Sequence, residues 1–224
     1  GPGEDYEAYP RTLEADAALA GAAGVSIIFA PSVEEMYPDG DPLIRISSGE
    51  LGTKFEGATR PGHFDGVLAV VNKFFNIIRP AAGNHPVNAY FGQKDAQQYI
   101  LIQRMVRDFN HDVTMRPVAI VREDNGLALS SRNSYLSDEE RESALVLSRT
   151  LAMLRENSLN RGFHEIDLDG ARERINSTPG ARLDYLELVD PMTFGEPTEE
   201  SERVLALVAA FVGPTRLIDN MDLR

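Results

Sequence analysis

Helical and extended patterns alternate through the first 120 residues, and this alternation constrains the fold more than any other feature of the sequence. Residues 13–23 are rich in alanine and predict a helix, with Thr12 as its N-cap and Gly24 as its stop. Residues 25–30 are a short apolar run of the kind found in buried strands. Because strands that are separated by helices pair in parallel, this order predicts an α/β domain on a parallel sheet. The other elements expected in this half are helices at residues 64–78 and 97–109 and strands at residues 87–91 and 113–121.

The second half of the chain has a different pattern, in which helices come first and strands follow without helices between them. Ser137 and Glu140 have the spacing of a capping box, which predicts the start of a long helix that ends near Leu159. This order favours a small antiparallel sheet with helices on one face. We therefore expect a nucleotide-type α/β domain over residues 1–120 and a smaller α+β domain over residues 121–224. The remaining expected elements are a helix at residues 167–176 and strands at residues 183–189, 204–212 and 216–219.

Charge and cysteine content exclude several classes of function. The chain has 22 Lys and Arg against 35 Asp and Glu, a formal net charge of −13. Such a surface repels nucleic acids and anionic membranes, so we expect neither as a partner. The absence of cysteine excludes disulfides, thiolate nucleophiles and cysteine zinc sites, and it fits a reducing cytoplasm. No apolar run approaches the roughly 18 residues that span a bilayer.

Residues 91–98 join the end of an expected strand to the start of an expected helix, where ligands bind in open α/β sheets. Gly92 lets a ligand approach the backbone, and Lys94 adds positive charge beside a helix N-terminus, which suits a polyphosphate. An alternative is purely structural, because Asp95 and Gln98 also have the spacing of a capping box. Both interpretations are compatible with one another.

A second polar loop precedes the long helix. Ser130 and Ser131 supply two hydroxyls and Arg132 a guanidinium, which together can hold a triphosphate, although an ordinary polar turn has the same composition. The two loops, roughly 35 residues apart with a strand between them, suggest two sides of one nucleotide cleft. The four histidines lack the spacing of a metal site.

Six motifs are spread in order over essentially the whole chain. They are EDYEAYPRT at residues 4–12, MYPDG at 36–40, RPGHFDGV at 60–67, FGQKDAQQ at 91–98, LSSRN at 129–133 and RLIDN at 216–220. Together these motifs resemble the pantoate–β-alanine ligase family. That resemblance implies a Rossmann-like N-terminal domain of the nucleotidyltransferase type and a smaller C-terminal domain over the active site, usually in a homodimer. It implies that ATP and pantoate form pantoyl adenylate and pyrophosphate, after which β-alanine displaces AMP, with Mg²⁺ required.

The resemblance also implies roles for individual residues. Asp16 falls near a magnesium position of the family, but Ala15 stands where a second acidic residue is expected. The catalytic residues implied are Lys94, Ser130, Ser131 and Arg132. The ATP-binding residues implied are Gly92, Gln93, Lys94 and Asp95, with Val121 and Leu129 beside the adenine and Ser130, Ser131 and Arg132 around the triphosphate. The pantoate-binding residues implied are Gln98, His63, Val67, Val70 and Val71.

Two departures from the family pattern qualify this expectation. The first strand of the family and its HxGH motif should lie upstream of Gly1, so we expect these 224 residues alone to show weak ATP affinity and negligible turnover. Residues 81–87 make the link before the FGQKD motif about six residues longer than usual. The alternatives are a related adenylyl- or cytidylyltransferase, and a non-catalytic fragment that binds nucleotide or dimerises.

Overall fold

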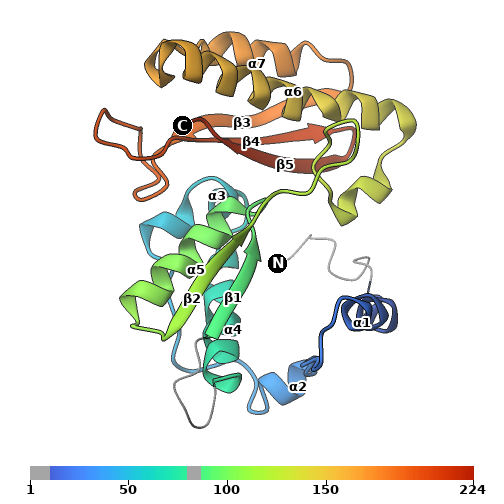
Figure 1. Cartoon of the computed structure of the whole chain (residues 1–224), viewed down its shortest axis with the longest axis vertical. Helices are drawn as coiled ribbons and strands as arrows, with labels where there is room; N and C mark the ends of the chain where they lie inside the picture. Colours follow the sequence, from blue (N-terminus) through green and yellow to red (C-terminus); the bar gives the residue numbers. More distant parts are fainter. Residues whose placement is uncertain (1–10, 80–86) are drawn as a thin grey trace. The chain divides into compact units, whose positions relative to one another are not determined.

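The computed structural model describes residues 11–79 and 87–224 and divides the chain into two compact units, residues 1–46 and 47–224 (Figure 1). The motif at residues 4–12 and the long link at residues 81–87 fall largely outside the described residues. The domain division near Val121 falls between the two sheets and stays a prediction. Short elements of the second unit are η1 (Glu50–Thr53), α3 (Glu56–Thr59), η2 (Ser131–Tyr135) and η3 (Phe163–Glu165).

The first unit contains α1 (Leu13–Ala22) and α2 (Val33–Met36). The helix expected at residues 13–23 is confirmed, although the Thr12 side chain donates to Asp16 Oδ1 instead of capping the helix backbone. The strand expected at residues 25–30 is wrong, because this segment forms no helix or paired strand and Ile27 is 83% exposed. A strand needs a hydrogen-bonded neighbour, and none of the described strands pairs with this run.

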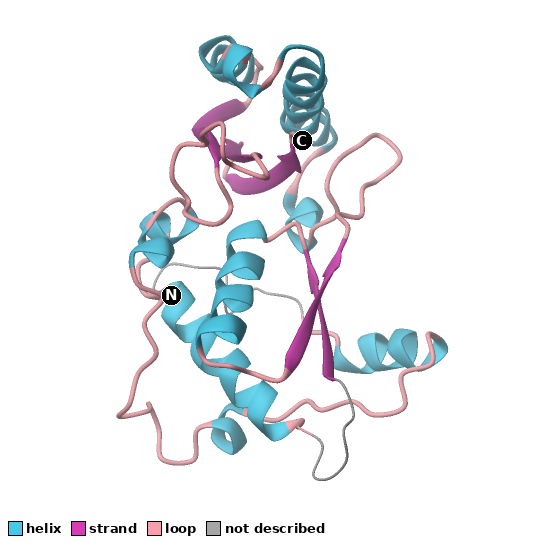
Figure 2. Ribbon diagram, turned by 60° about the vertical axis from the view of Figure 1, so that its left-hand side comes forward, coloured by secondary structure: helices cyan, strands magenta, loops and turns pink. Residues whose placement is uncertain are grey.

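The parallel pair predicted for the first half is confirmed. Strands β1 (Val87–Gly92) and β2 (Val113–Val118) run parallel in continuous register, connected by α5 (Ala96–Asp108) (Figure 2). Within the second unit, α5 and α4 (His63–Ile77) pack together, and the Phe75 ring of α4 meets the Phe91 ring of β1 edge-on at 6.4 Å. This arrangement sets the carboxyl end of β1 directly before the N-terminus of α5, which is where a ligand site was expected.

The predicted antiparallel sheet with helices on one face is also confirmed. Strands β3 (Ala181–Val189), β4 (Leu205–Val212) and β5 (Thr215–Asp222) pair in that order, and α6 (Asp138–Arg161) and α7 (Leu168–Asn176) lie over one face (Figure 1). The central strand β4 is buried almost throughout, so its sequence is continuously apolar instead of alternating. Its side chains and the inner faces of the helices form the largest core of the chain.

The long helix begins as its sequence predicts. The Ser137 hydroxyl accepts from the Glu140 backbone amide at 3.2 Å, and the Glu140 carboxylate accepts from the Ser137 amide at 2.8 Å. These reciprocal bonds satisfy two amides that the helix leaves without internal partners. Among the described helices, none is long and apolar enough to cross a membrane.

Candidate active site

The first candidate segment lies where β1 ends. Gly92 is the last residue of β1, it is exposed, and no protein atom lies within 4 Å of where a Cβ would be, so the space beside it is open. The Gln93 amide donates to Val118 O at 2.8 Å, which ties the segment to the end of β2. Among the described residues, none forms a hydrogen bond or ion pair with the Lys94 ammonium. A cation is thus left available beside a helix N-terminus.

The capping box expected at Asp95 is wrong. Asp95 occupies the N-cap position of α5, but its side chain accepts no bond from the first turn, because the backbone there has φ −89° and ψ 64° instead of the extended conformation usual for a cap. The first-turn amides of α5 are therefore free of a carboxylate cap. These amides remain available to bind an anion, which the positive end of the helix dipole would stabilise.

The second candidate segment is held by a tight hairpin. Arg122 and Ala128 form an antiparallel bridge, and the Glu123 amide donates to Leu127 O at 2.8 Å. Ser130 then caps η2, its hydroxyl accepting from the Arg132 amide at 3.3 Å. The Ser130 hydroxyl thus shapes the loop in this state, while Ser131 is exposed.

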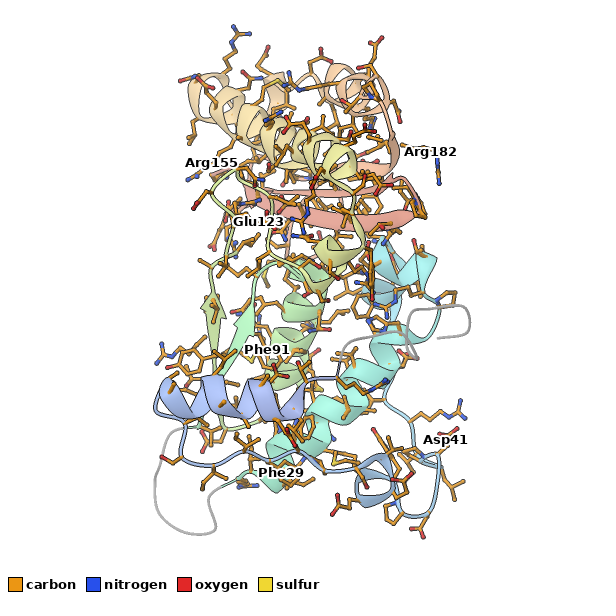
Figure 3. The ribbon with its side chains drawn as sticks, turned by 90° about the vertical axis from the view of Figure 1, so that its right-hand side faces the viewer. Phe29, Asp41, Phe91, Glu123, Arg155 and Arg182 are labelled. Atoms are coloured by element: carbon orange, nitrogen blue, oxygen red, sulfur yellow. The ribbon has the colours of Figure 1, made fainter. Side chains whose placement is uncertain are left out.

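Hydrogen bonds of buried and half-buried polar groups stabilise the loop at Ser130. Asn133 is only 3% exposed, and its amide donates to Glu123 Oε1 at 3.0 Å and to Ala128 O at 3.1 Å. Arg141 of α6 donates to Asn133 O and forms an ion pair with Glu123, whose side chain lies on the hairpin in Figure 3. Together these bonds fix the backbone that leads into Ser131 and Arg132.

The two candidate segments meet at neighbouring residues of β5. The Asn220 side-chain amide donates to Gln93 O at 2.9 Å and to Lys94 O at 2.8 Å. The Asp219 carboxylate accepts two bonds from the Arg122 guanidinium, at 2.7 and 2.9 Å. β5 also contacts η2. The structure therefore brings the Lys94 segment and the hairpin before Ser130 to the same stretch of one strand.

An exposed apolar pair lies beside this junction. The Leu129 amide donates to Val121 O at 2.9 Å, so the two residues are direct neighbours, and their side chains are 56% and 61% exposed. Two adjacent exposed aliphatic side chains suit the flat face of a base.

The residues of α4 that the resemblance assigns to pantoate divide into two groups along the helix. His63, Val67 and Val70 are half-buried and share one face of the helix, since their spacings are four and three. Arg60 Nη1 lies 2.8 Å from His63 Nε2, and because a guanidinium only donates, this nitrogen accepts. Val71 is 8% exposed and lies on the buried stripe of Phe64, Leu68 and Phe75.

The two glutamines after Asp95 have different environments. Gln97 is 3% exposed, and its side chain accepts from the Glu56 amide and donates to the carbonyls of Leu51 and Lys54. Gln98 is half-buried and, among the described residues, has no hydrogen-bond partner. Gln98 is thus the one that remains available to a substrate.

The described residues do not build a magnesium cage. None of their His, Asp and Glu side chains gather in groups of three, and Asp16 lies on α1, in the other unit, without a second acid beside it. Mg²⁺ retains several waters and binds substrate phosphates with only one or two carboxylates, so a protein-built cage is not required for an ATP-dependent reaction.

One described pocket lies elsewhere. It has a volume of about 530 Å³ between α3, β3 and the turn at Phe194, and it includes none of the predicted site residues. Asp184 and Glu187 line it and are paired with Arg216 and Arg172, but no Lys or Arg is among its lining residues, so the pocket offers no cation to a triphosphate. The nucleotide site is therefore not assigned to this pocket.

Comparison with known proteins identifies the family. A family model described as Pantoate-beta-alanine ligase matches residues 1–222. The pantothenate synthetase of Corynebacterium glutamicum (strain R) is 51% identical, over 98% of this chain and 77% of that relative. The chain belongs to the pantoate–β-alanine ligase family. The resemblance seen in six motifs is thereby confirmed, and with it the assignment as a ligase that forms a carbon–nitrogen bond.

Solved structures of this ligase family have the same fold. Pantothenate synthetase from Thermus thermophilus is 45% identical with a TM-score of 0.89, over 100% of this chain and 79% of that one. The pantoate-beta-alanine ligase from Francisella tularensis, complexed with beta-gamma ATP and beta-alanine, is 33% identical with a TM-score of 0.74, over 97% of this chain and 72% of that one. Both comparisons support the predicted combination of a parallel and an antiparallel sheet.

Sequence reasoning missed the residues that connect the two loops. The RLIDN motif contains Asp219 and Asn220 and the LSSRN motif contains Asn133, so both signals were present. Neither motif indicates a partner. The bonds of Asp219 and Asn220 join residues about 100 positions or more apart, and those of Asn133 form only once the hairpin has folded. Arg122, Glu123 and Arg141 have no sequence signal at all.

Proposed function

We propose that this chain joins pantoate to β-alanine at the expense of ATP, with the Lys94 segment and the Ser130–Arg132 segment gripping one triphosphate. The proposal depends on the junction at β5, because hydrogen bonds to Asp219 and from Asn220 attach both cationic segments to this one strand. Supporting features are the uncapped N-terminus of α5 and the available Lys94 ammonium.

In the first half-reaction a carboxylate oxygen of pantoate attacks the α-phosphorus of ATP, and the bond to the leaving pyrophosphate breaks. Negative charge grows on the equatorial oxygens, where Lys94, Arg132 and the hydroxyls of Ser130 and Ser131 can stabilise it. In the second half-reaction the β-alanine amine attacks the acyl carbon, AMP leaves with the bonding electrons, and the amine gives up a proton. The chain needs no nucleophile of its own, in agreement with its lack of cysteine.

The remaining residues bind and orient the substrates. Val121 and Leu129 border the adenine, Gly92 and Asp95 lie by the ribose, and Gln93 belongs to the same ATP-binding run. Gln98 hydrogen-bonds pantoate. His63, Val67 and Val70 form the wall of the pantoate pocket, with Val71 behind them. These groups hold two anions in line against their mutual repulsion, which is most of the remaining catalytic work.

We also propose that magnesium enters with the phosphates of ATP, whose charge it neutralises, that the enzyme is a homodimer, and that it works in the cytoplasm. A chelator is expected to abolish turnover and added Mg²⁺ to restore it. Sedimentation is expected to give about twice the chain mass of 24.7 kDa.

The test measures pyrophosphate and AMP separately. Two polypeptides are used: the 224 residues, and a chimera in which the HxGH segment that the resemblance places ahead of Gly1 is taken from the Corynebacterium glutamicum relative. We expect pyrophosphate–ATP exchange that requires pantoate, and AMP release that requires β-alanine as well. Exchange without pantoate would indicate another nucleotidyltransferase. No reaction by either polypeptide would overturn the proposal.

Variants then assign the residues. Lys94→Ala and Arg132→Ala are each expected to lower kcat by roughly 10²–10³, the usual cost of one preorganised charge or donor. Arg149→Ala is the control, since Arg149 is exposed and pairs with Glu142 on α6. Equal losses in all three variants would contradict the assignment.

A further inference from the structure

The consecutive residues Asp219 and Asn220 of β5 connect two loops. Asn220 is 5% exposed and Asp219 is 4% exposed, although both carry polar side chains. Buried polar groups are costly unless their hydrogen bonds are satisfied, and here each side chain bonds to a segment outside its own sheet, while Asp219 also accepts from the Asn220 amide.

Asn220 has the right chemistry for the first segment. A primary amide has two N–H groups, and Asn220 gives one to Gln93 O and one to Lys94 O. These carbonyls belong to consecutive residues, so the bonds fix the orientation of both peptide planes. They thereby set the direction in which the backbone enters the first turn of α5.

Asp219 has the right chemistry for the second segment. Its two oxygens accept from the two terminal nitrogens of Arg122, a planar pairing that fixes orientation as well as distance. Arg122 also donates to Gly126 O at 3.1 Å and bridges Ala128 across the hairpin. The pairing therefore fixes the position of the hairpin and, with it, the position of Ser130 at its end.

The two halves of the connector are themselves coupled. Asp219 Oδ1 accepts from the backbone amide of Asn220 at 2.8 Å as well as from Arg122. A shift of Arg122 would thus pull on the residue that holds Lys94.

We propose that Asn220 and Asp219 are positioning residues that set the separation of the two triphosphate-binding segments, so that they control ATP affinity without contacting ATP. The expected effect on ATP affinity rests on the proposed function. The physical linkage of the loops can be tested without it.

The first experiment measures amide hydrogen exchange in the 224-residue chain. Asn220→Ala is expected to accelerate exchange at least tenfold at Gln93, whose amide donates to Val118 O, and to change exchange at residues 122–129 much less. Asp219→Asn is expected to give the reverse pattern. Asp222→Asn is a matched control on the same strand, since Asp222 also pairs with an arginine, Arg203, but away from the loops. If Asp219→Asn does not fold, Arg122→Lys removes the same planar pairing from its more exposed side.

The second experiment measures Michaelis constants in whichever polypeptide forms pantothenate. Asn220→Ala and Asp219→Asn are each expected to raise KM for ATP about tenfold and to leave KM for β-alanine within twofold. A double variant of Arg122→Lys and Asp219→Asn should be no worse than either single one, since one pairing is lost in each case.

The outcomes separate this inference from the proposed function. Uniform acceleration of exchange along the chain, or an equal rise in all Michaelis constants, would show a merely structural role and overturn the inference. If no polypeptide forms pantothenate, the proposed function fails, while the local exchange pattern still decides whether the pair links the loops.

Discussion

At the scale of single residues, Glu56 shows how charged groups are accommodated at the base of α3. Its carboxylate accepts from Arg216 at 2.7 and 2.8 Å and from the Tyr185 hydroxyl at 2.9 Å. Burial disfavours ionisation of the phenol, and the charge of Glu56 adds to this, so the pKa of Tyr185 is raised far above its ordinary value. Burial opposes the charge of Arg216, but its bonds and attraction to Glu56 outweigh this and raise its pKa.

The raised pKa of Tyr185 predicts a loss of stability in alkali. As pH rises above the ordinary tyrosine pKa of 10.0, the phenol ionises in the unfolded chain first, so unfolding becomes easier. Tyr185→Phe removes this contribution. We expect thermal melting between about pH 9 and 11 to show a steeper fall for the parent than for the variant.

The variant has a second expected effect below about pH 9. It should be less stable by about 1 kcal/mol, because Glu56 loses one hydrogen-bond donor. Tyr90→Phe, at a tyrosine that is 68% exposed, serves as the control. Identical pH slopes for the parent and Tyr185→Phe would refute the prediction.

At the scale of elements, local signals predicted structure well wherever the deciding contacts are themselves local. The capping box at Ser137 depends on residues three apart and is confirmed. The run at residues 25–30 has the composition of a strand but forms none, because a strand exists only through a partner that composition does not reveal. Asp95 has the residue type of a cap, yet its backbone is not in a capping conformation.

The capping box gives a direct prediction for α6. Ser137→Ala removes the acceptor for the Glu140 amide and should cost about 1 kcal/mol in the free energy of unfolding. Ser143→Ala is the matched control in the same helix, where alanine is the better helix former and should be neutral or slightly stabilising. Denaturant titrations would measure both, and equal effects would contradict a capping role.

Two glycines are expected to respond oppositely to alanine. Gly66 lies within α4 with no atom within 4 Å of an added Cβ, so Gly66→Ala should stabilise by about 0.5–1 kcal/mol. In Gly57→Ala the new Cβ would collide with the carbonyl of Gly52, which is backbone and cannot move aside. That variant should lose about 1–3 kcal/mol. Melting temperatures that shift in the same direction would refute this pair.

Gly66 also lies on the face of α4 that carries His63, Val67 and Val70. If this face contacts pantoate, Gly66→Ala should raise KM for pantoate although it stabilises the fold. Unchanged binding of pantoate would place the substrate elsewhere.

At the scale of the whole molecule, the two units differ in how much they bury. Among residues 11–46 only Met36 is buried, whereas residues 47–224 contain both described apolar clusters. The alternating patterns predicted the sheets of the larger unit but carried no sign of this division. Motif resemblance supplied the candidate site residues, while the bonds that connect them span more than 90 positions and follow only from the folded chain.

The difference in burial predicts the course of limited proteolysis. Arg11 and Arg45 are the only lysine or arginine residues in the first 46, and both are exposed. Trypsin should cleave first after Arg45, since sparsely packed segments open most easily, and leave residues 46–224 largely intact. Mass spectrometry of the early fragments would show this, and Arg45→Gln should remove that product. Initial cleavage inside residues 47–224 would contradict it.

The bond between Lys94 and Asn220 joins positions that are 126 residues apart, which has a consequence for synthesis on the ribosome. At about 5–20 residues per second, roughly 6 to 25 s pass between translation of the Lys94 segment and translation of the strand that holds it. During that interval the segment lacks the two hydrogen bonds that Asn220 supplies. Its final conformation is therefore reached late in synthesis, after the α/β elements have already had time to collapse.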